Sequence, residues 1–154
     1  MNLIILPNQL FEKHPGLKLV PSKVILLEDS LFFGDHHHSA DFHKQKLWLH
    51  RATMKRYQAD LEDQGFKTLY IDYDPTPCAL DKQLASVSKS IKSSPKKLIV
   101  CEPTDFILEK RLQRISRALK VDIEFLPSPG FLNTREQNVD YRACLLYTSD
   151  AADE

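Results

Sequence analysis

The stretch FHKQKLWLHRATMKRYQADL, residues 42–61, decides the kind of fold, because it is the longest segment with its apolar residues on one helical face. These residues recur at steps of three and four, at Leu47, His50, Met54, Tyr57 and Leu61. Asp41 is a candidate N-cap, and Gly65 stands where a left-handed C-terminal cap is expected. The pattern predicts an amphipathic helix that packs on an apolar layer.

Short apolar runs on either side of this helix predict the layer. They lie at residues 3–6, 23–28, 68–72 and 97–102, with a weaker run at 121–126. Because the runs are nearly unbroken in apolar residues, they suit strands that are covered on both faces. Helix-like segments between successive strands suit right-handed crossovers. We therefore expect an α/β protein with a parallel sheet.

Two further helices are expected after the third and fourth strands. The stripe of the first is Leu80, Leu84, Val87 and Ile91, and the stripe of the second is Leu108, Leu112, Ile115 and Leu119. Thr104 and Asp105 precede the second helix as candidate caps. Its basic residues, which are Lys110, Arg111, Arg114 and Arg117, are expected to form a solvated face.

Size and composition indicate one domain without a strong electrostatic field. The chain has 154 residues, 42% of them hydrophobic, and 21 basic residues balance 21 acidic ones. No run resembles a secretion signal or reaches membrane-spanning length, so a cytoplasmic protein is expected. Cys78, Cys101 and Cys144 lie far apart and predict neither a disulfide framework nor a metal knuckle. Cys101 is expected to be a buried free thiol.

Polar side chains follow the first two strands, at the edge where parallel sheets bind ligands. Asn8 and Gln9 follow the first strand, and they either hydrogen-bond a ligand or close a turn. Glu28 and Asp29 follow the second strand, and they either accept hydrogen bonds from a ligand or serve in capping and solvation. The glycines of a dinucleotide-binding turn or a P-loop are absent from this region.

Histidines and lysines surround the start of the 42–61 helix. His36, His37 and His38 are consecutive and therefore disfavour a metal site. The segment Phe32-Phe33-Gly34 is either a lid or an anchored loop. His43, Lys44 and Lys46 oppose the helix dipole, which indicates either an anionic or ring-bearing ligand or pairing with Glu28 or Asp29. His50 lies on the apolar face and is expected to be structural, and no catalytic residue is assigned.

Several motifs together resemble one known family. They are LPNQL at 6–10, FHKQKL at 42–47, HRA at 50–52 with Met54, Glu102-Pro103, and Ser128-Pro129 before Phe131-Leu132. In this order they resemble the deoxyribodipyrimidine photolyase-related family, which is similar to bacterial iron-sulfur cryptochromes and (6-4) photolyases. The resemblance covers about residues 2–142.

The resemblance implies a Rossmann-like three-layer sandwich with a five-stranded parallel sheet over residues 1–132, followed by the start of an interdomain linker over 133–143. It also implies a carboxyl-terminal helical domain that holds FAD and a 4Fe-4S cluster. The full-length parent would be a lyase-type flavoprotein that repairs damaged DNA with light, or a blue-light sensor. A lumazine-type antenna chromophore would lie near Asn8, Gln9, Glu28 and His43. Pro7-Asn8 stands where some relatives carry Gly-Asp.

The last residues fit neither this family nor a fold argument. Residues 144–154 resemble a sequencing adapter translated in frame, so Cys144 is not expected to bind a cluster. On this reading the chain alone is inert, and its partner is the carboxyl-terminal domain. A competing reading is a stand-alone α/β module that binds a nucleotide-like or anionic ligand through Asn8, Gln9, Glu28 and the turn 43–46. A hydrolase or transferase using His43 or His50 as a base is a third reading, but it lacks a positioned nucleophile.

Overall fold

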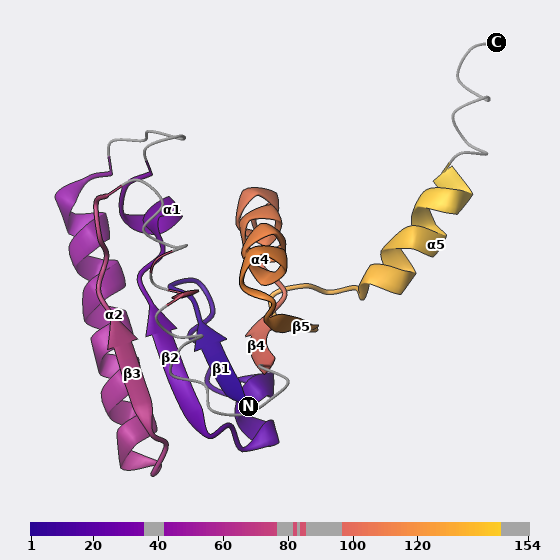
Figure 1. Ribbon diagram of the computed structural model, residues 1–154. Helices are drawn as coiled ribbons and strands as arrows, with labels where there is room; N and C mark the ends of the chain where they lie inside the picture. Colours follow the sequence, from indigo (N-terminus) through magenta and orange to yellow (C-terminus); the bar gives the residue numbers. More distant parts are fainter. Residues whose placement is uncertain (36–41, 77–81, 83, 86–96, 146–154) are drawn as a thin grey trace.

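A parallel sheet organises the chain, as a computed structural model of residues 1–35, 42–76, 82, 84, 85 and 97–145 shows (Figure 1). The strands are β1 (Asn2–Ile5), β2 (Lys23–Leu27), β3 (Thr68–Ile71), β4 (Lys97–Cys101) and β5 (Asp122–Leu126). All pairings are parallel, in the order β3-β2-β1-β4-β5. The predicted parallel sheet is therefore confirmed, and its strand order reverses direction between β1 and β4.

Two hydrophobic cores, one on each face of the sheet, produce a three-layer sandwich. Ile4 and Leu6 on one face pack with α4 (Phe106–Leu119), while Leu3 and Ile5 on the other face pack with α2 (Lys44–Asp63). This alternation follows from the two-residue period of a strand. The side chains of residues 3–6 and 24–27 are buried, as expected for strands that are covered on both faces.

Helix α2 confirms the amphipathic pattern over 42–61. Met54 and Leu61 are buried, and Leu47 and Tyr57 are partly buried against the same core. The N-cap is His43, whose ring accepts a hydrogen bond from the Gln45 backbone N–H, and not Asp41, which lies outside the described residues. Gly65 has φ +85° just after the helix, which confirms the predicted left-handed cap.

Helix α4 also begins and packs as predicted. The carboxylate of Asp105 accepts hydrogen bonds from the backbone N–H groups of Ile107 and Leu108, and the stripe Leu108, Leu112 and Ile115 is buried. The prediction that Arg111 lies on a solvated face is wrong. Its side chain is 14% exposed and forms an ion pair with Asp35, because this turn of α4 lies over the buried residues that follow β2.

The helix predicted from Leu80 to Ile91 lies largely outside the described residues. Leu84 is described and is buried in the core that α4 covers. The described part of the α/β unit also contains two short elements: η1 (Pro15–Leu19), a 3-10 helix, and α1 (Ser30–Phe33). Gly16 of η1 sits so close to Leu3 that an added Cβ would lie 2.4 Å from the Leu3 side chain. Only glycine fits at this position without a shift of the core.

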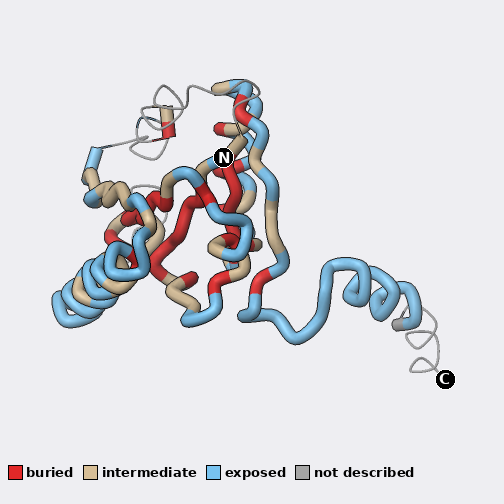
Figure 2. Tube along the Cα trace, turned by 90° about the horizontal axis from the view of Figure 1, so that it is seen from below, coloured by how far each residue is buried: buried red, intermediate tan, exposed pale blue. Residues whose placement is uncertain are grey.

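A helix occupies the segment where the sequence predicted the start of a linker. Helix α5 (Arg135–Leu145) extends away from the sheet (Figure 1), and residues 135–144 are exposed (Figure 2). It runs across the predicted boundary between 143 and 144. Its assignment as interdomain linker stays a prediction. In the described part of the chain, no helix has the length and apolar character needed to cross a membrane.

Candidate functional site

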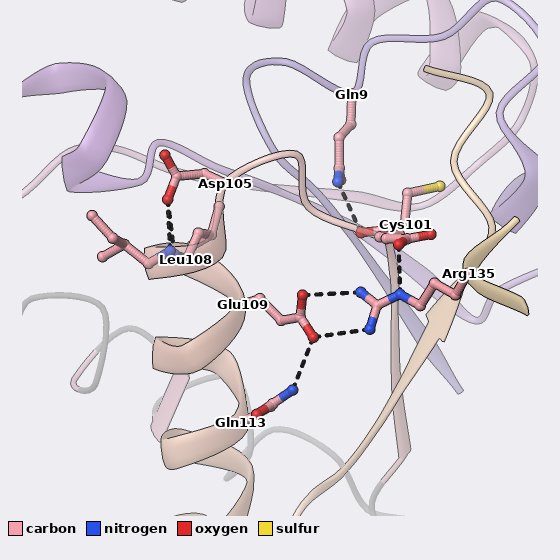
Figure 3. Close-up of polar contacts among 9 residues, drawn as sticks. Gln9, Cys101, Asp105, Leu108, Glu109, Gln113 and Arg135 are labelled. Atoms are coloured by element: carbon pink, nitrogen blue, oxygen red, sulfur yellow. Dashed lines mark hydrogen bonds and ion pairs between the residues drawn. The ribbon is translucent and has the colours of Figure 1, made fainter. Parts of the chain in front are cut away.

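Asn8 and Gln9 lie at the point where the strand order reverses. The Asn8 side-chain amide donates to Thr104 Oγ1, which follows β4, at 2.9 Å. Gln9 is buried, and its side-chain amide donates to the Cys101 carbonyl at 2.9 Å (Figure 3). The Gln9 backbone N–H also closes a turn onto the Leu6 carbonyl. In open α/β sheets, ligands bind outside the carboxyl ends of the strands at this switch point.

The side-chain oxygens of Asn8 and Gln9 have no hydrogen-bond partner. Within the described part of the chain, the buried side-chain oxygens that accept no hydrogen bond are Asn8 Oδ1, Gln9 Oε1 and Asp29 Oδ2. The Cys101 carbonyl can only accept, so the bond to it fixes which atom of the Gln9 amide is the nitrogen, whereas in the Asn8 amide the nitrogen is the atom that faces Thr104 Oγ1, a hydroxyl that can accept or donate. Buried acceptors normally have partners, so two unpaired oxygens here are free to accept N–H or O–H groups.

Glu28, in contrast, is fully engaged by the protein. Its Oε1 accepts from Arg51 Nε at 2.8 Å and from the Tyr70 hydroxyl at 2.6 Å. Its Oε2 accepts from Arg51 at 2.6 Å and from the Tyr73 backbone N–H at 2.8 Å. Burial raises the pKa of this carboxyl, but the hydrogen bonds from these three residues outweigh burial and lower it. Glu28 therefore ties β2 to α2 and to β3 as an ionised carboxylate.

Asp29 and Asp35 form a second polar group, beside α4. Asp29 caps α1 by accepting from the Leu31 backbone N–H at 2.9 Å, and burial raises its pKa. Arg111 pairs with Asp35 and donates to the Ser30 hydroxyl at 3.3 Å. These contacts give Asp29 the capping role that the sequence left open.

Phe32 and Phe33 end α1 and Gly34 is its C-cap, so the predicted segment is an anchored helix end. The Tyr73 hydroxyl donates to the Gly34 carbonyl at 2.7 Å, and the ring of Phe33 stacks on that of Tyr73 at 5.9 Å. The rings of Phe32 and Phe33 lie 6.0 and 6.1 Å from that of His50. Gly34 has φ +142°, and an added Cβ would lie 3.0 Å from the Tyr73 hydroxyl. His50 thus packs in an aromatic cluster, where burial and then Lys46 lower its pKa.

The four predicted site residues separate into three environments. Asn8 and Gln9 contact the segment at and after β4, whereas Glu28 contacts α2, β3 and the residues after it. His43 is exposed and caps its own helix. That a ligand touches all four stays a prediction, and the geometry favours Asn8 and Gln9 as the residues with free acceptor atoms.

Sequence reasoning missed the partners of these residues. Thr104 was considered only as a helix cap, although its place after β4 matches that of Asn8 after β1. Arg51 was considered as part of the motif HRA at 50–52, and its pairing with Glu28 depends on the packing of α2 over β2. For Arg51 the sequence offers no comparable signal.

A cavity at the same edge lies beside β4 and β5. It has a volume of about 260 Å³ and is lined in part by Glu102, Ser128, Phe131 and Arg135. Arg135 donates to Glu102 at 2.5 Å and, through both terminal nitrogens, to Glu109 at 3.0 and 2.9 Å (Figure 3). One wall of the cavity is therefore fixed by Arg135, which lies between the carboxylates of Glu102 and Glu109.

The described residues gather no metal-binding groups at this edge. Among the described residues no group of three or more His, Cys, Asp and Glu side chains could hold a metal ion, and His36, His37 and His38 lie outside those residues. Cys101 is a buried free thiol as predicted, its Sγ 3.5 Å from His14 Nε2, and burial raises its pKa to about 11. Cys144 is exposed on α5.

The fold and the switch-point residues define an α/β protein of the doubly wound, open-sheet class. The chain belongs to the deoxyribodipyrimidine photo-lyase-related protein family, which it matches over residues 3–143. It is also 35% identical over 134 residues to an uncharacterized protein of Acanthamoeba polyphaga mimivirus. The match covers 85% of this chain and spans 65% of the length of that viral protein.

Proposed function

We propose that this chain is the amino-terminal α/β part of a cytoplasmic photolyase-related flavoprotein. The parent would split pyrimidine lesions in damaged DNA with light, or signal in response to blue light. Within it, this part would hold an antenna chromophore and dock the carboxyl-terminal helical domain. The observation that carries the proposal is the pair of unpartnered amide oxygens at the switch point, in a chain that belongs to the photolyase-related family.

The free oxygens suit a flat ring that carries N–H and hydroxyl donors, such as a lumazine. Asn8 Oδ1 and Gln9 Oε1 would accept hydrogen bonds from it, while their nitrogens stay bound to Thr104 and Cys101. Glu28 fits a ligand less well, because protein donors already occupy both its oxygens. The proposed contacts are therefore Asn8 and Gln9 first, with His43 at the exposed helix start.

A 4Fe-4S cluster does not fit the two cysteines that the structure describes. A cluster needs several cysteine thiolates together, whereas Cys101 is buried beside His14 and Cys144 lies on α5. We propose that both cofactors bind in the carboxyl-terminal domain, as the resemblance to the family implies, where FAD would supply the light-driven electron transfer. The role of this chain's residues is to bind and orient.

Exposed apolar residues near α5 support a docking role. Leu132, Val139 and Tyr141 are exposed, and Phe106 at the start of α4 is 66% exposed. Phe106, Phe131 and Val139 line a groove of about 450 Å³ between α4 and α5. Apolar surface of this kind marks a protein contact. We place the carboxyl-terminal domain against it.

Titration with 6,7-dimethyl-8-ribityllumazine tests the antenna site. Fluorescence anisotropy should show binding to the chain, and Asn8→Ala or Gln9→Ala should weaken it about tenfold, since each removes a buried acceptor. Asn133→Ala removes an exposed amide and serves as the matched control. Equal binding by Asn8→Ala, Gln9→Ala and the control would contradict the site.

The flavoprotein assignment is tested on a full-length family member with its carboxyl-terminal domain. Purified protein should show flavin absorption and a broad iron-sulfur band, with about one FAD and one cluster per chain. A folded, colourless protein would contradict the assignment, whatever the lumazine titration gives.

One observation favours a second candidate, a stand-alone α/β module for a nucleotide-like or anionic ligand. Since 134 residues are 65% of the viral relative, that protein has about 200 residues and leaves about 70 outside the match. About 70 residues lie at the small end of the size range of domains, which leaves little chain for a flavin-holding helical domain. A long helix-rich reading frame with four cysteines after codon 143 supports the flavoprotein, and a native stop codon there supports the module.

A further inference from the structure

The solvent side of α4 carries a local excess of positive charge. From Lys110 to Lys120 the chain contains five basic residues and no acidic one, although the formal net charge of the whole chain is zero. Arg111 turns inward and pairs with Asp35, whereas Lys110, Arg117 and Lys120 are exposed. We call these three exposed residues the basic row. Lys110 and Arg117 are seven residues apart and therefore lie within about 20° of each other around the helix axis.

Carboxylates of the protein do not neutralise the basic row. Among the residues that the structure describes, none of the ion pairs involves a member of the row. The Lys110 Nζ lies 4.3 Å from the centroid of the Phe106 ring, which is uncharged. Glu109, the acidic residue next to Lys110, binds Arg135 instead. The row therefore retains its charge for a partner outside the α/β unit.

Lys120 occupies a backbone conformation that disfavours lysine. It is the C-cap of α4 with φ +51°, in the left-handed region, and its backbone N–H donates to the Ser116 carbonyl. Glycine usually occupies left-handed helix ends, because a Cβ is strained there. A residue that breaks a local rule in this way marks a place where function competes with stability.

We propose that the basic row binds the phosphate backbone of duplex DNA, whatever the base sequence and whether or not the DNA is damaged. Ten residues of an α-helix rise by about 15 Å. One strand of a duplex carries about four phosphates over that length, so the three side chains can each reach a different phosphate. The choice of DNA over RNA rests on the proposed function, whereas the binding itself needs neither light nor flavin.

The surroundings of the row favour a nucleic acid over other partners. An anionic membrane surface binds helices that insert an apolar face, and Phe106 is the one large exposed hydrophobic residue of α4, all of which the structure describes. The groove proposed for the carboxyl-terminal domain is lined by Phe106 and by no residue of the basic row. Both surfaces can therefore be occupied at once.

Fluorescence anisotropy with a labelled, undamaged DNA duplex of about 20 base pairs, in the dark and from about 10 to 100 mM salt, tests the proposal. The wild-type chain should bind with a Kd on the order of 10 µM at the lowest salt, and log affinity should fall with log salt with a slope of about −3, one for each phosphate contact. Lys110→Gln and Arg117→Gln should each weaken binding at least about tenfold at the lowest salt and reduce the slope by about 1.

Lys18→Gln is the matched control. It makes the same chemical change at an exposed position of η1, whose Leu17 packs in the core on the opposite face of the sheet. It should bind DNA like the wild type. Arg117→Lys retains the charge and should also bind like the wild type, which a role of Arg117 in packing alone would not predict.

Lys120→Gly separates binding from damage to the fold. It removes a charge of the row and relieves the left-handed cap, so DNA binding should weaken at least about tenfold while the thermal midpoint rises. Weakened binding with a lowered midpoint would assign Lys120 a structural role and contradict its place in the row.

Three results would overturn the proposal. They are no binding at about 100 µM chain in the lowest salt, equal weakening by Lys18→Gln and the variants of the row, and tighter binding to an RNA duplex of the same sequence. None of them bears on the flavoprotein assignment, which the bound chromophores of a full-length family member test separately.

Discussion

At the scale of single residues, His14 shows how burial sets a protonation state. The side chain is 1% exposed, its Nδ1 accepts from the Gly16 backbone N–H, and its Nε2 faces Cys101 Sγ. With Nδ1 as an acceptor, the ring is neutral and carries its proton on Nε2. Burial lowers the pKa of His14 to about 4.

This burial predicts a loss of stability in mild acid. Below pH 6.5 the unfolded imidazole takes up a proton, but the folded one does not until about pH 4, so protonation favours the unfolded state. The free energy of unfolding should therefore fall by about 2 kcal/mol from pH 7 to pH 5 on account of His14. Urea unfolding at both pH values measures it.

His14→Asn is the matched variant, because its side-chain oxygen can accept the same Gly16 N–H without titrating. The part of the pH dependence that His14 causes should disappear in it. An equally steep loss of stability in the variant would assign the effect to other groups.

At the scale of elements, one buried carboxylate connects two strands and a helix. Glu28 follows β2, and Arg51 of α2 and Tyr70 of β3 both donate to it. Arg51 is half exposed, so the value of the ion pair itself is reduced by solvent. Removing the Glu28 carboxylate would lower stability mainly because the buried donors that bind it would lose a charged acceptor.

Glu28→Gln should lower the free energy of unfolding by about 2 kcal/mol at pH 7, because the amide retains the shape but replaces one carboxylate oxygen with an NH2 group, which cannot accept from the two donors that face it. Chemical denaturation measures the difference. Glu12→Gln, at an exposed position, makes the same chemical change and should leave stability unaltered. The difference between the variants should also shrink as pH falls through the lowered pKa of Glu28. Equal stability of the two variants at pH 7 would show that Glu28 is not the connecting group.

At the scale of the whole molecule, α5 is joined to the α/β unit mainly through polar contacts of its first residue. Arg135 binds Glu102 and Glu109, whereas residues 135–144 are all exposed. Hydrogen bonding to Glu109 first, and then to Glu102, raises the pKa of Arg135. No described residue of α5 belongs to either hydrophobic core.

Arg135→Ala should therefore release α5 without unfolding the sheet. Hydrogen exchange of α5 amides should become about five-fold faster, as expected for the loss of about 1 kcal/mol from a partly exposed network. The thermal midpoint of the α/β unit should stay unchanged. Arg142→Ala, an exposed arginine further along the same helix, is the control and should leave exchange near Arg135 unaltered. A large drop of the midpoint in Arg135→Ala would show that α5 is part of the core fold.

Local sequence determined the elements of this protein. The five strands formed at the apolar runs 3–6, 23–28, 68–72, 97–102 and 121–126. The apolar stripes of α2 and α4 form the buried faces of these two helices. These patterns are readable because burial acts with the period of each element. Asp105 and Gly65 were predictable for the same reason, since a cap acts within one turn.

Only the tertiary structure decided which polar groups meet. The strand order brings Asn8 beside Thr104, 96 positions later in the chain, and the packing of α2 brings Arg51 to Glu28. Arg111 likewise pairs with Asp35 and does not lie on the predicted solvated face, because helix packing brings the two residues together. A hydrogen bond depends on atoms within about 3 Å, and residues far apart in sequence reach that distance only after strands and helices have packed.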